Sequence, residues 1–215
     1  MKPDSSRPQA RIAAGLDAVA IVPPSGAVEK LAAHLALVTE WNEACGLTAV
    51  RDADGMILRH VLDSAAALPF LRGRWMLDAG SGAGFPGIVL ALLAPDTTWV
   101  LVESNGKKAG FLDHVLRRLG LGARVELYAG RLESYPGAPD FDTVTVRALA
   151  NLARIGEWCE DLLAPGGRLL AFKGRLREIE RECAGLDANW RVAIEALRVP
   201  GLAAERHIVI LERGS

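Results

Sequence analysis

The glycine-rich segment Trp75–Ile88 constrains the fold of this chain more than any other part of the sequence. A short apolar run ends in the acid Asp78, four glycines follow at positions 80, 82, 84 and 87, and an apolar stretch begins at Ile88. Strand, glycine turn and helix, in this order, form the first unit of a nucleotide-binding α/β fold. Glycines let the backbone turn tightly and let a ligand approach where a Cβ would clash.

A second acid follows at the spacing that such folds use for ribose binding. The run Trp99–Glu103 is predicted to be a strand ending in a carboxylate, about 20 residues after the glycine turn. Open α/β sheets bind ligands at the carboxyl ends of their strands, where both Asp78 and Glu103 are expected. Glu103 is therefore predicted to bind the ribose hydroxyls of a cofactor; the alternative is a solvated acid at a strand end.

Two nucleotide templates fit the turn. The spacing Gly82–Gly87 matches the G-x-G-x-x-G of NAD and FAD proteins, and Asp78–Gly84 matches the D-x-G-x-G-x-G of S-adenosylmethionine (SAM) methyltransferases. Pro86 removes one of the helix amides that a pyrophosphate would need, and it suits the first turn of a helix. This favours SAM, with Asp78, Gly80, Gly82 and Gly84 at the cofactor. Two alternatives remain. One is an NAD-dependent oxidoreductase, and the other is a glycine turn that only allows the helix and the strand to pack closely.

Length and composition exclude several classes of protein. The 215 residues suffice for one α/β domain with a small extension. No apolar run approaches the roughly 20 residues that cross a bilayer, and the N-terminus lacks a signal core, so a cytoplasmic protein without membrane contact is expected. The three cysteines are scattered, which predicts neither a disulfide framework nor a metal site. With a net charge of −1, a nucleic-acid partner requires a local basic patch.

The order of apolar patterns predicts three regions. Residues 1–25 are expected to be loosely ordered, 26–70 to form a helical cap, and 71–215 to form the SAM-binding domain. The cap helices are predicted at 27–44 and 54–68. Further helices are expected at 86–94, 106–119, 151–163 and 175–184, and strands at 75–79, 98–103, 124–128, 142–146, 168–172, 190–198 and 207–212. This alternation predicts a mostly parallel seven-stranded sheet whose last strand is antiparallel, because no helix separates the final two.

Several polar side chains are candidates for binding RNA. Arg147 ends the fourth strand at the ligand-binding edge, where it suits a carboxylate or a phosphate. His60 and Asp63 lie one helical turn apart and are expected to interact. The predicted RNA contacts are Arg59, His60, Lys107, Lys108, Lys173, Arg206 and His207. The alternative for each is a solvated face or a surface ion pair.

Seven short segments, in order, resemble the bacterial 16S rRNA guanine-N7 methyltransferases of the RsmG (GidB) family, over about residues 28–213. They are Leu47–Arg51, Arg59–Ser64, Leu77–Gly87, Gly106–Lys108, Val146–Ala148, Phe172–Gly174 and Glu205–His207. The resemblance implies a class I SAM-dependent methyltransferase fold, Rossmann-like, with a small helical cap. It also implies that SAM donates the methyl group and that the acceptor is one guanine in the 530 loop of 16S rRNA, guanosine-527 in the usual numbering.

Matching positions imply roles for particular residues. The resemblance places SAM contacts at Gly80, Phe85, Leu132, Glu133 and Arg147, and it implies that Arg147 also positions the reactants. Guanine N7 carries a lone pair and no proton, so no general base is expected. No metal is expected either, because no further His or acid is suitably spaced near His60 and Asp63. The expected partner is 16S rRNA within the 30S subunit or its precursor, met by a monomer. A SAM- or RNA-binding module without turnover is the alternative outside the enzymes.

Overall fold

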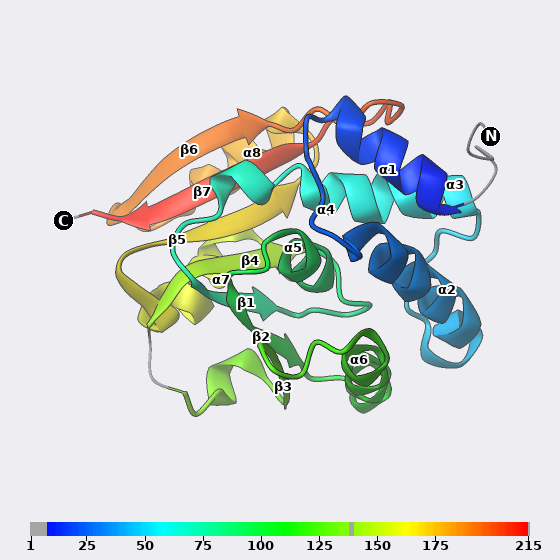
Figure 1. Ribbon diagram of the computed structural model, residues 1–215. Helices are drawn as coiled ribbons and strands as arrows, with labels where there is room; N and C mark the ends of the chain where they lie inside the picture. Colours follow the sequence, from blue (N-terminus) through cyan, green and yellow to red (C-terminus); the bar gives the residue numbers. More distant parts are fainter. Residues whose placement is uncertain (1–7, 138–139, 215) are drawn as a thin grey trace.

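The computed structural model describes residues 8–137 and 140–214, which form a seven-stranded sheet between two layers of helices (Figure 1). The strands are β1 (Trp75–Ala79), β2 (Thr98–Glu103), β3 (Val125–Ala129), β4 (Phe141–Arg147), β5 (Leu163–Lys173), β6 (Trp190–Ala196) and β7 (His207–Arg213). The seven predicted strands are therefore confirmed. Most ends lie within two residues of the prediction, while β5 begins five residues earlier.

The sheet order is β3-β2-β1-β4-β5-β7-β6. The pairs from β3 to β5 are parallel, and β7 runs antiparallel to both β5 and β6. This confirms the mostly parallel sheet with an antiparallel final strand. The order reverses between β1 and β4, so the crevice outside their carboxyl ends is where an α/β sheet of this kind binds ligands.

Alternating side chains of the central strands enter two separate cores. Met76 and Leu101 face the layer that contains α5 (Gly87–Leu93) and α6 (Gly106–Leu119). Their neighbours Leu77 and Val100 face the opposite layer, with α7 (Leu152–Cys159) and α8 (Leu176–Cys183). Strands buried on both faces in this way are typical of parallel sheets, and they hold the strand ends rigidly at the ligand-binding edge.

The N-terminal segment corrects one prediction. Residues 8–18 were expected to be loosely ordered, but Pro8–Ala18 forms helix α1, in which Ile12 and Leu16 are completely buried. These two residues are four apart and so lie on one face of the helix, which packs against α2 (Ala27–Cys45). Two apolar contacts in a Pro- and Ala-rich stretch gave too weak a periodic signal. Residues 1–7 lie outside the described part of the chain.

The rest of the cap is one helical run with a change of geometry in its middle. Helix α3 (Ala53–Met56) continues into the π-helix η1 (Ile57–Leu62) and then into α4 (Asp63–Ala65). The prediction of a helix over 54–68 missed this π-helix, a form that often marks functional sites. The cap shares the core of α5 and α6, so it is packed as one body with that layer of the sheet.

Among the described residues, no helix combines the length and the apolar character that crossing a bilayer requires.

Candidate active site

Two neighbouring pockets open at the carboxyl edge of the sheet. The turn pocket, of about 430 Å³, is lined by Gly80, Val102, Ser104, Gly130, Arg131, Leu132, Glu133, Leu149 and Trp158. The arginine pocket, of about 470 Å³, is lined by Thr48, Ala49, Val50, Arg59, His60, Asp63, Arg147, Ala148, Phe172, Lys173, Gly174 and Arg206. The end of β4 and the residues after it lie between them, because Leu149 lines the first pocket while Arg147 and Ala148 line the second.

The glycine turn beside the turn pocket uses backbone conformations that favour glycine. Gly80, Gly82 and Gly84 have φ angles of +70°, +56° and +86°. A Cβ on Gly84 would lie 2.4 Å from the side chain of Ile88, and one on Gly80 would lie 2.8 Å from Leu149. The tight turn predicted from the glycine spacing is therefore present, and Gly80 forms part of the pocket wall.

Asp78 lines neither pocket, although it was predicted to contact the cofactor. Its side chain lies beneath the turn, where Thr145 Oγ1 donates to Oδ1 at 2.7 Å and the Gly87 N–H donates to Oδ2 at 3.2 Å. Burial raises the pKa of this carboxyl above its usual range. Asp78 therefore ties β1 to β4 and to the start of α5, a structural task that the sequence motif does not distinguish from ligand binding.

Glu103 also supports the turn. Its carboxylate accepts hydrogen bonds from the N–H of Gly82 at 2.8 Å and from the N–H of Asn105 at 2.7 Å. The turn is thereby joined to the residue that caps α6. Each carboxylate oxygen has a further lone pair, and Val102 and Ser104 on either side line the turn pocket. The ribose contact of Glu103 stays a prediction.

Phe85 of the glycine turn is buried and stacks with two histidine rings, although it lines neither pocket. The rings of His34 and His60 each stack on Phe85 with centroids 4.7 Å apart, and the Arg147 guanidinium lies 5.5 Å from the Phe85 centroid. His34 comes from α2, and its Nε2 lies 2.8 Å from Ala83 O; sequence reasoning missed it, since a lone histidine in an apolar helix gives no signal. Burial lowers the pKa of both histidines to about 4, so both are neutral at pH 7.

The polar contacts of the arginine pocket differ from the predicted ones. His60 does not pair with Asp63; its Nε2 lies 2.7 Å from Thr48 Oγ1. Asp63 instead contacts two arginines from distant segments, Arg147 Nη1 at 3.6 Å and Arg206 Nε at 3.1 Å. Its side chain is only 5% exposed, and burial raises the pKa of this carboxyl.

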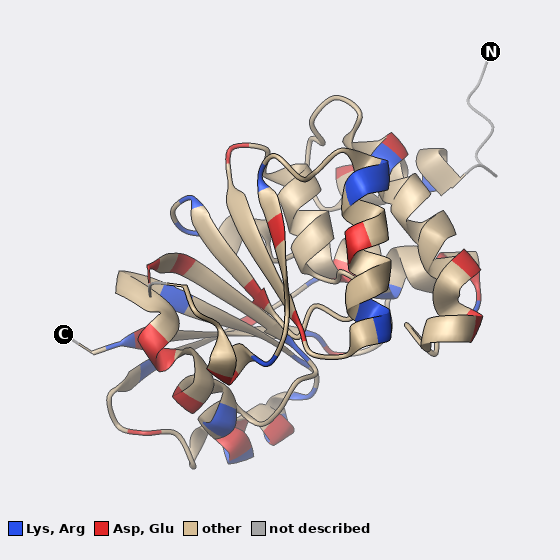
Figure 2. Cartoon of the chain, turned by 90° about the horizontal axis from the view of Figure 1, so that it is seen from below, with Lys and Arg blue, Asp and Glu red and all other residues tan. Residues whose placement is uncertain are grey.

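The predicted RNA-binding residues occupy different places. Arg59, Lys173 and Arg206 line the arginine pocket with His60, whereas Lys107, Lys108 and His207 line neither pocket. Lys173 is not a free cation, because its Nζ pairs with Glu182 at 2.7 Å and donates to Ala150 O at 3.0 Å. In the view of Figure 2, Lys and Arg are interspersed with Asp and Glu, so no face of a single sign is visible there.

Comparison with known proteins decides the family. A family model described as rRNA small subunit methyltransferase G (GidB) matches residues 27–209. The chain belongs to the rRNA small subunit methyltransferase G family. The relative of that name from Salmonella arizonae is 43% identical over 183 residues, which are 85% of this chain and 87% of the relative. The relative from Alkalilimnicola ehrlichii is 45% identical over 197 residues, 91% of this chain and 88% of its own length.

Solved structures show the same fold at low identity. A putative O-methyltransferase from Klebsiella pneumoniae aligns with a TM-score of 0.62 at 19% identity, covering 94% of this chain and 97% of its own. The B. subtilis M1A22 tRNA methyltransferase TrmK aligns with a TM-score of 0.56 at 16% identity, covering 74% and 68%. The family and the class I fold confirm the predicted resemblance and SAM as the cofactor, and they exclude the NAD-dependent oxidoreductase.

Proposed function

We propose that this member of the family transfers a methyl group from SAM to N7 of a single guanine in 16S rRNA. The observation that carries the proposal is the pair of neighbouring pockets at the end of β4, one lined by Leu149 and the other by Arg147. Donor and acceptor bound in adjacent pockets are held in reach of each other, and positioning alone supplies much of the rate of such a transfer.

The turn pocket fits SAM. Its volume of about 430 Å³ lies within the range of small-molecule sites. Gly80, Leu132 and Glu133 line it, as the resemblance implies, while Gly82, Gly84 and Phe85 shape the turn beside it. Glu103 is proposed to bind the ribose through its remaining lone pairs, and Asp78 is proposed to act only by holding the turn. When bound, SAM supplies a methyl group on a positively charged sulfur.

The arginine pocket fits a nucleotide. Three of its lining residues, Arg59, Arg147 and Arg206, carry guanidinium groups, which suit RNA phosphates. His60 lines it with its ring stacked on the buried Phe85, and aromatic rings are typical partners of exposed RNA bases. Arg147 belongs to both descriptions, since its guanidinium lies near Phe85 of the turn while its side chain lines the arginine pocket.

The charge states in the arginine pocket agree with an acceptor that carries no proton to remove. Among the described lining residues, His60 is held neutral by a pKa of about 4 and is hydrogen-bonded to Thr48, and Asp63 is paired with two arginines. Guanine N7 presents an in-plane lone pair and needs no base, unlike an amino or hydroxyl group. The methyl step therefore depends on placement of the base by Arg147 and its neighbours.

The partner follows from the same proposal. The substrate is 16S rRNA within the 30S subunit or its precursor, with guanosine in the 530 loop as the acceptor, and the enzyme works as a monomer in the cytoplasm. Lys107 at the start of α6 is exposed, and with Lys108 it is proposed to contact the RNA backbone outside the pockets, as is His207.

Mass mapping of 16S rRNA after incubation with SAM tests the proposal. Naked 16S rRNA and 30S subunits from a strain that lacks the enzyme serve as the two substrates. One N7-methylguanine is expected, and its formation in a single turnover is expected to vary little between about pH 6.5 and 8.5, since no side chain must lose a proton. Binding of SAM and RNA without product would make the chain a binding module. A rate that rises with pH, and loses this rise in His60→Gln, would refute the base-free mechanism; because the pKa of His60 is about 4, the profile is extended down to that pH.

A further inference from the structure

Asp63 has the most unusual charge environment of the arginine pocket. Among the described residues that line the pocket it is the only acid, and it faces the guanidinium groups of Arg147 and Arg206. Lys173 already has Glu182 as its partner. Asp63 therefore offsets one of the three remaining positive charges, on Arg59, Arg147 and Arg206, that line the place proposed for the guanine.

The proposed reaction makes this balance important. The bond between the methyl carbon and sulfur breaks with its electron pair left on sulfur, and the N7 lone pair forms the new bond to carbon. No proton moves, the leaving thioether is neutral, and the positive charge passes to the base. Two or three guanidinium groups next to the base repel the positive charge that forms on it, which raises the free energy of the transition state. A carboxylate among these groups lowers that free energy.

Two arginines favour the charged form of Asp63, and they oppose the burial that raises its pKa. It is the first residue of α4, directly after the π-helix, and its partners come from the end of β4 and from the segment before β7. The carboxylate thus joins the cap to two parts of the sheet domain. Because its side chain is only 5% exposed, its interaction with a neighbouring charge is less screened by solvent than that of a surface acid.

We propose that Asp63 is a positioning residue that orients Arg147 and Arg206 and offsets their charge, so that the cationic methylated base forms faster. This inference rests on the proposed N7 methylation. A residue needed only for docking would change RNA affinity, since phosphate contacts dominate that affinity. Asp63 is expected to affect binding and rate in opposite directions. Removing its negative charge from the pocket favours binding of the RNA backbone, while it disfavours formation of the cationic product.

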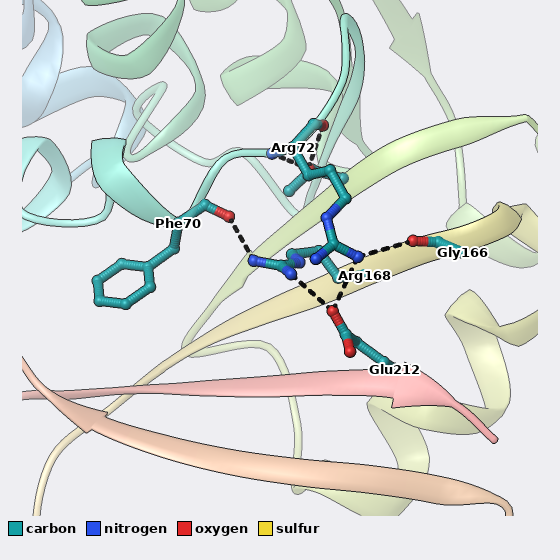
Figure 3. A network of polar contacts seen from close by, with 6 residues as sticks. Phe70, Arg72, Gly166, Arg168 and Glu212 are labelled. Atoms are coloured by element: carbon teal, nitrogen blue, oxygen red, sulfur yellow. Dashed lines mark hydrogen bonds and ion pairs between the residues drawn. The ribbon is translucent and has the colours of Figure 1, made fainter.

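A second cluster of the same composition supplies a matched control. Glu212 on β7 contacts Arg72 Nη1 at 3.1 Å and Arg168 Nη2 at 2.6 Å, again one carboxylate between two arginines (Figure 3). Arg168 lies in the middle of β5, five residues or roughly 17 Å of extended strand before Lys173, and neither Arg72, Arg168 nor Glu212 lines the arginine pocket. Glu212→Gln removes the same charge as Asp63→Asn without altering the pocket.

The experiment compares the two variants with the unaltered enzyme on 30S subunits. Asp63→Asn is expected to lower the single-turnover rate at saturating SAM by about tenfold, the order expected for one unit charge several ångströms away. Its affinity for 30S is expected to stay equal or to tighten, and Glu212→Gln is expected to change neither quantity. A thermal melt and SAM calorimetry on each protein show that it is folded and that the turn pocket is intact.

Asp63→Glu keeps the charge and is expected to recover most of the rate. Weaker 30S binding with an unchanged rate in Asp63→Asn would make Asp63 a docking residue and overturn the proposal. An equal loss in Asp63→Asn and Asp63→Glu would show that only the packing of this side chain matters, and would also overturn it. If Asp63→Asn does not fold, Asp63→Glu and Asp63→Ala are compared instead. Asp63→Glu with at least half of the unaltered rate, beside a slow Asp63→Ala, supports a role for the charge. A slow Asp63→Glu beside a faster Asp63→Ala contradicts it.

The mass map separates the two proposals. If the unaltered enzyme places the methyl group on an atom other than N7, the proposed function fails, whatever Asp63 does. If N7-methylguanine forms and Asp63→Asn makes it at the unaltered rate, the proposed function stands and only the role of Asp63 is lost.

Discussion

The turn pocket and the arginine pocket share a wall but are built in different ways. The turn pocket lies beside the glycine turn, which is held by backbone groups: three glycines are in the left-handed region, and the carboxylates of Asp78 and Glu103 accept backbone N–H groups. The arginine pocket is made by side chains from distant segments, which are held by the ion pairs of Asp63. One site is fixed by the sheet; the other depends on a balance of charges.

This difference suits the two ligands. A small cofactor is recognised best by groups that do not move, because each group ordered on binding costs free energy. An RNA loop must be splayed to expose its base, and it brings phosphates that compete for the same guanidinium groups. Ion pairs can exchange partners when phosphates bind, whereas the backbone hydrogen bonds of the glycine turn cannot. The variants below test this difference between the two pockets.

The largest expected effect concerns His34 and His60, whose rings stack on the buried Phe85 of the glycine turn. Their folded-state pKa is lowered from 6.5 to about 4, so between these values the unfolded chain binds protons that the folded protein does not. The free energy of unfolding should therefore fall as the pH drops from about 6.5 to 4. For the fully buried His34 the loss is about 3 kcal/mol over this window, or about 1.4 kcal/mol per pH unit.

Urea unfolding at several pH values, on the unaltered protein and on His34→Gln, measures this effect. The glutamine cannot titrate, so the difference between the two proteins isolates His34, while Asp63 and Asp78 contribute equally to both. The stability of His34→Gln should decline less steeply on acidification. Parallel pH profiles would mean that His34 is charged in the folded state and that the stack is looser than described.

The sequence predicted the glycine turn more completely than it predicted the contacts of the arginine pocket. The turn and its strands were predicted with near-correct bounds, because glycine spacing and apolar alternation are local signals. Arg147 was placed at the edge of the sheet for the same reason. The partnership of Asp63 with Arg147 and Arg206 was not predicted, since it joins segments more than 80 residues apart on the chain, and helical spacing pointed to His60 instead. His34 and helix α1 were missed because burial, not pattern, defines them.

The next prediction concerns Asp78, whose buried carboxylate supports the glycine turn. Thr145→Val removes the hydroxyl that donates to its buried carboxylate, which should destabilise the protein by about 2 kcal/mol, as for a buried charged acceptor left without its donor. Thr143→Val on the same strand is the control: its buried hydroxyl bonds only neutral backbone groups of Arg72, and such bonds contribute less than those to a charged group, so a smaller loss of about 1 kcal/mol is expected. Chemical denaturation measures both. Equal losses would mean that the Asp78 carboxylate has no special dependence on Thr145.

Gly80 tests whether the turn pocket holds SAM. Gly80→Ala adds a Cβ at φ +70°, within 2.8 Å of Leu149, while Gly166→Ala adds one at φ +76° where nothing lies within 4 Å. Both should lose about 1–2 kcal/mol of stability from the left-handed backbone. Only Gly80→Ala is expected to weaken SAM binding, by about tenfold or about 1.4 kcal/mol, because the pocket wall must shift. Calorimetry with SAM on both proteins would contradict the assignment if their affinities were the same.

The smallest expected effect separates paired from unpaired cations in the arginine pocket. Arg59 is exposed at the pocket, whereas Lys173 is already neutralised by Glu182 at 2.7 Å. A cation that neutralises a phosphate releases a counterion, so Arg59→Ala should flatten the plot of log K against log salt for 30S binding by about one unit. Lys173→Ala should leave the slope nearly unchanged, because Glu182 rather than RNA is its partner. Binding measured from low to moderate salt gives both slopes. If Lys173→Ala flattened the slope instead, the Lys173–Glu182 pair would have to open when RNA binds. The ion pairs of the arginine pocket would then exchange partners on binding, which the backbone hydrogen bonds of the neighbouring glycine turn cannot do.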